Sequence, residues 1–131
     1  FFDDDSEYLP RTYKTENCVA YPGSHDADCV KTWCKNLSGD ALLRFKKEWP
    51  HRKNQSRAYD LIELAMSSPA NLTVVPMQDY LDLGGDARMN FPGTCDGTNW
   101  TWRALDGVLT EELAAKIRKL TTLYGRLGNQ E

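Results

Sequence analysis

Residues 18–26 read Cys-Val-Ala-Tyr-Pro-Gly-Ser-His-Asp, a short apolar run that stops at Pro22-Gly23 and is followed by a histidine and an aspartate. An apolar run bounded by proline and glycine is typical of a buried strand. Polar residues that directly follow such a strand lie at the carboxyl edge of a parallel sheet, where α/β proteins place their chemistry. The stretch therefore predicts a strand that presents His25 and Asp26 as candidate functional residues.

A second run of the same kind follows three predicted helices. Apolar spacing predicts helices over residues 27–36, 39–49 and 56–67, and Asn71–Met77 is a second short, β-branched run. Because its apolar residues do not alternate cleanly with polar ones, we expect this strand to be buried on both faces. Strand, helices and strand in this order predict a right-handed crossover between parallel neighbours, and a last helix follows. The expected N-caps are Ser38, Ser56 and Thr110.

Length and composition predict one globular unit, and the order of the predicted strands and helices makes it α/β. The chain has 131 residues, of which 40% are apolar and 27% charged, and its formal net charge is -3. Lysine and arginine are scattered except at Lys46-Lys47 and residues 51–53, so we expect no nucleic-acid partner. We also expect no membrane partner, because no apolar run approaches the roughly 20 residues needed to cross a bilayer and no signal-peptide pattern is present.

Four cysteines allow either free thiols or a metal site. They are Cys18, Cys29, Cys34 and Cys95, and no Cys-x-x-Cys pair exists among them. We expect free thiols in a cytoplasmic protein with no cofactor. A zinc site of His25, Cys29 and Cys34 is the alternative, but the spacing fits no common ligand pattern and a fourth ligand is not evident.

Three segments carry a specific resemblance. They are Tyr-Pro-Gly-Ser-His-Asp at 21–26, Val-Pro-Met-Gln-Asp-Tyr-Leu-Asp-Leu-Gly at 75–84, and Ala-Arg-Met-Asn-Phe-Pro-Gly-Thr at 87–94 followed by Asn-Trp-Thr-Trp-Arg at 99–103. Together and in this order they resemble the C-terminal part of the 4-α-glucanotransferases, or amylomaltases, of glycoside hydrolase family 77. The family fold is a (β/α)8 barrel, so the resemblance implies that residues 1–131 form the C-terminal segment of that catalytic domain, with strands seven and eight.

A complete barrel of this kind needs about 250 residues or more. The chain also starts Phe1-Phe2-Asp3-Asp4-Asp5, without an initiator methionine. We therefore expect it to be a fragment of an enzyme, whose missing N-terminal part would be its natural partner.

The resemblance implies transfer of α-1,4-glucan segments between maltooligosaccharides with retention, through a covalent glycosyl-enzyme. By motif match Asp26 is the carboxylate that stabilises the transition state, and His25 donates a hydrogen bond to the same sugar. Asn90 is expected near the donor site. The family's nucleophile and general acid belong upstream of Phe1, so we expect the isolated chain to be inactive.

Other residues of these segments have a functional and a structural interpretation. Asp79 could form a carboxylate pair with Asp26, but an acid beyond a strand more often caps a turn or fixes a loop, here residues 81–84. Trp100 and Trp102 could stack on sugar rings, although such tryptophans more often pack a loop onto the barrel. The rival function from another class is a free-standing carbohydrate- or protein-binding α/β module, which would have to keep two open strand edges soluble.

Overall fold

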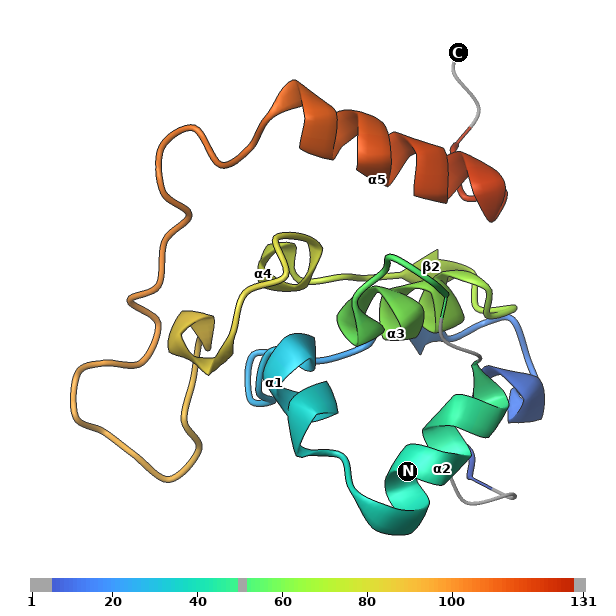
Figure 1. Ribbon diagram of the computed structural model, residues 1–131, viewed down its shortest axis with the longest axis horizontal. Helices are drawn as coiled ribbons and strands as arrows, with labels where there is room; N and C mark the ends of the chain where they lie inside the picture. The colour runs from blue at the N-terminus through green and yellow to red at the C-terminus, as the bar shows by residue number, and fades with distance from the viewer. Residues whose placement is uncertain (1–5, 50–51, 129–131) are drawn as a thin grey trace.

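The computed structural model describes residues 6–49 and 52–128, arranged as a small parallel sheet with helices packed beside it (Figure 1). Residues 1–5, and His51 of the basic cluster at 51–53, lie outside the described residues. The elements, in chain order, are η1 Pro10–Thr12, β1 Val19–Ala20, α1 Val30–Asn36, α2 Gly39–Glu48, α3 Arg57–Met66, β2 Leu72–Thr73, α4 Met77–Tyr80, η2 Gly85–Ala87 and α5 Glu111–Leu123. Among these described helices, none is both long and apolar enough to cross a membrane.

The two predicted strands pair in parallel, as expected. Val19 lies opposite Leu72 and Ala20 opposite Thr73, and the Val74 amide extends the ladder by donating to the Ala20 carbonyl at 2.9 Å. Each strand is only two residues long, and the chain turns into helix α4 at Met77, which the sequence placed in the second strand. The parallel pairing is confirmed, whereas the handedness of the crossover stays a prediction.

The expectation that the second strand is buried on both faces is wrong. Leu72 is 54% exposed and Val74 is 50% exposed, whereas Ala20 on the first strand is buried. The covered face of the sheet lies against α3, because the Thr73 hydroxyl donates to the Ala65 carbonyl of that helix at 3.4 Å. Strands read as continuous apolar runs when helices cover both faces, but the described residues cover only one.

Helix α3 forms the centre of the core. Its residues from Ala58 to Met66 are all buried, and the Ser56 hydroxyl caps it by accepting from the Tyr59 amide at 3.3 Å, as predicted. The larger apolar cluster gathers around it from the crossover helices and from η1, and consists of Leu9, Val30, Cys34, Phe45, Ala58, Leu61 and Leu64. Leu9 is fully buried, so the otherwise surface-lying segment before β1 contributes one side chain to the core.

Two helix starts differ from their predictions. Ser38 occupies the N-cap position of α2 but its side chain makes no capping hydrogen bond, and the next residue, Gly39, has a φ of +52° that departs from regular helix geometry. Helix α1 starts at Val30 rather than at residue 27, because the Ala27 amide closes a turn onto the Ser24 carbonyl at 3.1 Å. The candidate residues His25 and Asp26 therefore lie in a turn and not at a helix start.

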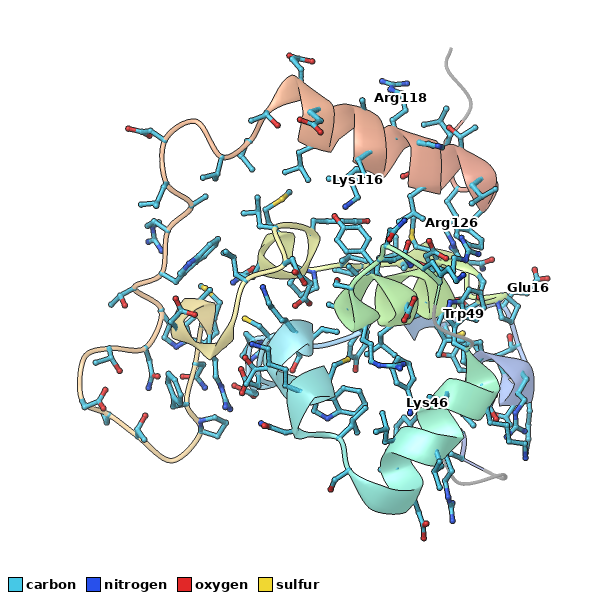
Figure 2. The ribbon with its side chains drawn as sticks, in the orientation of Figure 1. Glu16, Lys46, Trp49, Lys116, Arg118 and Arg126 are labelled. Atoms are coloured by element: carbon cyan, nitrogen blue, oxygen red, sulfur yellow. The ribbon has the colours of Figure 1, made fainter. Side chains whose placement is uncertain are left out.

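Helix α5 packs beside α3, and an arginine just beyond the end of α5 helps to hold the two together. The Thr110 hydroxyl caps α5 by accepting from the Leu113 amide at 3.1 Å, as predicted. Beyond the helix end, Arg126 reaches back to the segment that follows α3 (Figure 2). Its guanidinium donates to the carbonyls of Met66, Ser68 and Ala70 at 2.6, 2.6 and 2.9 Å.

Candidate functional site

The structure brings together the three residues that the sequence singled out. The Asn90 side-chain amide donates to Asp26 Oδ1 at 2.6 Å, and His25 Nε2 lies 3.3 Å from Asp26 Oδ2. The Asn90 backbone amide also donates to the His25 carbonyl at 3.1 Å. Both Asp26 and His25 keep about half of their side-chain surface exposed, at 52% and 54%. The site is thus an open carboxylate at the carboxyl end of β1, held by an amide from a segment 64 residues further along the chain.

Arg88 holds the backbone beneath this carboxylate. Its guanidinium donates to the Asp26 carbonyl at 2.6 Å and to the Asn90 carbonyl at 2.8 Å, so it bridges the two segments. Arginine side chains in irregular segments often satisfy backbone carbonyls in this way. The Arg88 guanidinium also lies 4.7 Å from the centre of the Phe91 ring, where a cation–π contact adds to its fixed position.

Trp100 contacts the candidate histidine, which the sequence did not predict. Its indole lies 5.0 Å from the His25 ring, centre to centre and tilted by 39°, and its side of the site stays open because Trp100 is 51% exposed. Trp100 has a φ of +66°, which is rare for a residue with a side chain, and its amide donates to the Met89 carbonyl at 2.6 Å. The sequence favoured a packing role for both Trp100 and Trp102. The half-exposed position of Trp100 beside His25 fits that role less well.

Asp79 is a buried acid that caps a helix from outside it. Its Oδ1 accepts from the Val30 amide, the first of α1, at 2.8 Å, and Asp79 is 2% exposed. Burial raises the pKa of the Asp79 carboxyl to about 6; the bond from Val30 lowers it and the charge of Asp82 raises it further. The structural interpretation of Asp79 as a capping acid is correct, but it caps α1 and not the local turn at residues 81–84. Engaged and buried in this way, Asp79 does not form an exposed carboxylate pair with Asp26.

A cavity of about 160 Å³ lies behind the turn that carries His25. The turn, the end of β2 and the Arg88 segment all line it, through residues that include Ser24, His25, Gln78, Asp79, Arg88 and Met89. His25 of the candidate site and the buried acid Asp79 therefore line the same small space.

The cysteines do not form a metal centre in the part of the chain that the structure describes. All four are free thiols, and no three histidine, cysteine or acidic side chains of the described residues are grouped as metal ligands. Cys34 belongs to the apolar cluster, where burial raises its thiol pKa to about 12, and burial likewise raises the pKa of Cys29 to about 11. Nothing here supports the zinc alternative.

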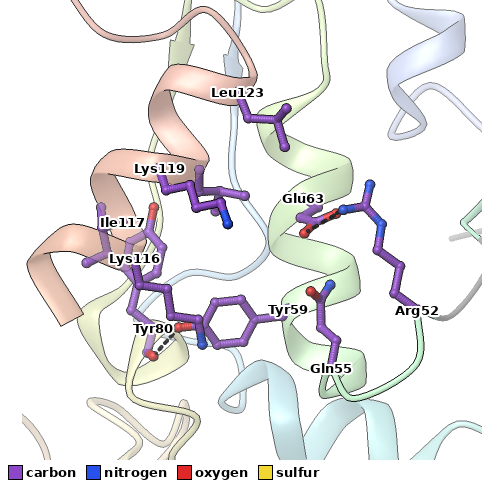
Figure 3. A pocket seen from close by; sticks show the side chains of 10 residues that line it. Arg52, Gln55, Tyr59, Glu63, Tyr80, Lys116, Ile117, Lys119 and Leu123 are labelled. Atoms are coloured by element: carbon purple, nitrogen blue, oxygen red, sulfur yellow. Dashed lines mark hydrogen bonds and ion pairs between the residues drawn. The ribbon is translucent and has the colours of Figure 1, made fainter. Parts of the chain in front are cut away.

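A second cavity, of about 250 Å³, lies between α3 and α5 (Figure 3). Lys116 Nζ lies over the Tyr59 ring at 3.5 Å, and Arg52 pairs with Glu63 at 2.9 Å. The Tyr59 hydroxyl donates to the Tyr80 carbonyl at 2.6 Å. Because most of its charged groups are engaged within the chain, this cavity is the gap where α5 rests on α3, and it contains none of the predicted site residues.

Comparison with known proteins agrees with the arrangement of these segments. A sequence model of the family described as 4-alpha-glucanotransferase matches residues 1–109. The chain belongs to the 4-alpha-glucanotransferase family. The 4-alpha-glucanotransferase of Clostridium butyricum is 42% identical over 126 residues, which cover 95% of this chain and 25% of the relative. The chloroplastic/amyloplastic 4-alpha-glucanotransferase of Solanum tuberosum is 36% identical over 128 residues, covering 95% of this chain and 22% of the relative.

A solved structure of the same family has the same fold over this region. The amylomaltase from Streptococcus agalactiae, in complex with acarbose, superposes with a TM-score of 0.88 at 32% sequence identity, and the match covers 95% of this chain and 25% of that one. The chain thus spans about a quarter of the length of the 4-alpha-glucanotransferases that it matches. Its two-stranded parallel sheet with flanking helices corresponds to a partial region of their larger fold.

Proposed function

We propose that residues 1–131 form the C-terminal segment of the (β/α)8 catalytic domain of a 4-alpha-glucanotransferase, with β1 and β2 as strands seven and eight. The parallel pairing of β1 with β2 through a helical crossover supports this placement. His25 and Asp26 lie in the turn that comes after β1, and active sites of such barrels lie at the carboxyl ends of the strands. The whole enzyme would transfer α-1,4-glucan segments between maltooligosaccharides with retention.

In this proposal Asp26 stabilises the transition state, and His25 and Asn90 bind the sugar. The observation that supports it is the bond of 2.6 Å from the Asn90 amide to Asp26 Oδ1. A carboxylate oriented by an amide and still half exposed can accept hydrogen bonds from sugar hydroxyls and face the positive charge of an oxocarbenium-like transition state. Because the group is positioned before the reaction, little reorganisation is needed when that charge develops.

The nucleophile and the general acid would come from residues outside these 131. Retaining glycoside cleavage needs two carboxyl groups about 5–5.5 Å apart across the sugar. Asp79, which comes shortly after the end of β2, is buried and accepts a hydrogen bond from the Val30 amide. We therefore expect the chain by itself to bind glucan weakly at most and to transfer none. We propose a cytoplasmic location, although the name of the Solanum tuberosum relative places that protein in a plastid.

The test uses this chain alone and in a hybrid enzyme. In the hybrid, this chain replaces the matching last quarter of the Clostridium butyricum relative. We expect the hybrid to disproportionate maltotriose and the chain alone to be inactive. Asp26→Asn should lower kcat of the hybrid by about a hundredfold or more, since it removes charge stabilisation that acts only in the transition state. Asp106→Asn, at an exposed turn, is the matched control.

Three results would contradict the proposal. One is transfer by the chain alone, and another is an Asp26→Asn hybrid as active as its parent. The third is a folded hybrid, judged by circular dichroism and a cooperative melt, without activity. Binding of maltotriose by the chain alone at micromolar concentration, without turnover, would favour the binding-module alternative.

A further inference from the structure

The loop that carries the candidate site, residues 22–29, is held mainly by polar contacts at its two sides. On one side, Arg88 and Asn90 bond to the backbone and side chain of Asp26 and to the backbone of His25. On the other side, the loop ends at Val30, whose amide donates to Asp79 Oδ1 at 2.8 Å. Residues 24 to 27 of the loop are exposed.

Apolar packing holds the end of this loop, where Cys29 and Val30 are buried, but not its exposed middle at residues 24–27. Ser24, His25 and Ala27 line the cavity of about 160 Å³ behind it, so part of the loop faces empty space rather than the core. The position of these exposed residues therefore depends on hydrogen bonds on both sides of the loop. The bond between Asp79 and Val30 connects the end of the loop to the segment following β2, and the neighbouring Lys31 adds a second connection by donating to the Asp82 carbonyl at 2.6 Å.

We propose that Asp79 is a positioning residue, which fixes the His25–Asp26 loop by anchoring its far end at Val30 to the segment that follows β2. This inference rests on the proposed function of Asp26, because only then does the placement of the loop affect catalysis. A misplacement of about 1 Å at a catalytic group can cost about a hundredfold in rate, so a distant anchor can be measured through kcat. Asp79 touches neither the substrate nor the reacting atoms in this scheme.

The strength of the anchor should depend on pH. A charged carboxylate accepts a hydrogen bond roughly twice as strongly as a neutral acceptor, and the raised pKa of Asp79, about 6, brings the change of charge into an accessible range. Other charged or titratable groups also face this region. His25 and Arg88 line the cavity, and Asp28, Cys29 and Cys34 lie at the start of α1 or within it. Asp82 and Asp86 lie in the turns after α4, and Tyr59 lies on α3.

Two substitutions of Asp79 separate the anchor from its charge. Asp79→Asn keeps a carbonyl oxygen for the Val30 amide but stays neutral, whereas Asp79→Ala removes the acceptor. In the hybrid enzyme at pH 7.5 we expect kcat to fall about threefold in the first variant and about tenfold or more in the second, with smaller changes in KM. Between pH 5 and pH 7.5 the parent hybrid should lose activity on acidification more steeply than Asp79→Asn, because that variant cannot lose a charge. Asp106→Asn should behave as the parent.

Comparing the melting temperature with kcat distinguishes a positioning residue from a merely structural one. Removing a buried charge should raise the melting temperature of Asp79→Asn at pH 7.5 while kcat falls, whereas a structural residue would move both in the same direction. The proposal is overturned if Asp79→Ala leaves kcat unchanged, or if Asp79→Asn retains the acid limb of the parent. If the folded hybrid is inactive, the proposed function fails. The anchoring role of Asp79 is then tested by hydrogen exchange in the 131-residue chain alone. There, the Val30 amide should lose its protection from hydrogen exchange in Asp79→Ala, and unchanged protection would refute the anchor.

Discussion

Arg126→Ala should destabilise the chain far more than alanine substitution of any lysine or arginine on α5. Arg126 donates four hydrogen bonds to the segment that closes α3, three of them to the carbonyls of Met66, Ser68 and Ala70 and one to the Ser68 hydroxyl at 3.2 Å. All three of these residues are buried. Without the guanidinium, each carbonyl left unpaired costs about 1–3 kcal/mol.

The expected loss is smaller than the sum of these bonds. Arg126 itself is only half-buried, so water can reach some of the carbonyls once the side chain is gone. We therefore expect the free energy of unfolding to fall by about 3 kcal/mol, measured by urea titration with circular dichroism. Arg126→Lys should recover less than half of this loss, because one ammonium cannot replace the planar fork of donors.

Arg118→Ala is the matched control, since Arg118 lies exposed on the outer side of α5 (Figure 2). Its substitution should change the stability by less than about 0.5 kcal/mol. The reasoning fails if Arg126→Ala costs no more than Arg118→Ala. It also fails if Arg126→Lys is as stable as the parent, since a single point charge would then suffice.

Three further outcomes follow from the pKa values and caps. Folding raises the pKa of Asp79 from 3.8 to about 6, so its contribution to stability is full below pH 3.8 and is lost as the pH rises through 6. At pH 7 the Asp79→Asn variant should therefore be more stable than the parent by up to about 3 kcal/mol. Equal stability of the two in urea titrations would contradict this. Cys95 is exposed and should react with a thiol reagent at pH 8 in the folded chain, whereas Cys34, buried and with a pKa of about 12, should react only on unfolding; equal rates would refute the assigned burial. Ser56→Ala should cost about 1 kcal/mol in the same urea titration through loss of the cap on α3, and Ser38→Ala, which removes no cap, should cost less.

Features determined by neighbouring residues could be predicted from the sequence. The caps at Ser56 and Thr110 depend on a hydroxyl and an amide three residues apart, and both are present. The parallel pairing of the strands follows because a long crossover between two apolar runs leaves few other arrangements. Strand burial could not be predicted in the same way, since it depends on what covers each face, and one face of β2 is open in the described residues.

The sequence named three candidate residues that the structure brings together, but it did not give the contacts between them. His25, Asp26 and Asn90 were found by motif, and their hydrogen bonds join segments more than 60 residues apart. No local pattern predicts such a bond. The contact of Trp100 with His25 was missed, because it depends on a left-handed backbone at a residue that rarely adopts one.

Asp79 shows why a local rule named the right role and the wrong partner. An acid after a strand was expected to cap the nearest turn, a rule that considers only residues close in the sequence. Parallel strands, however, bring their carboxyl ends side by side, so the segment that leaves β2 lies next to the helix that follows β1. The Val30 amide, 49 residues away in the chain, is thereby the unpaired donor that the carboxylate meets, because helix starts leave their first amides without internal partners. The ends of β1 and β2 lie side by side, which brings His25 and Asp26 close to Asn90. The same arrangement also places Asp79 where it can anchor their loop.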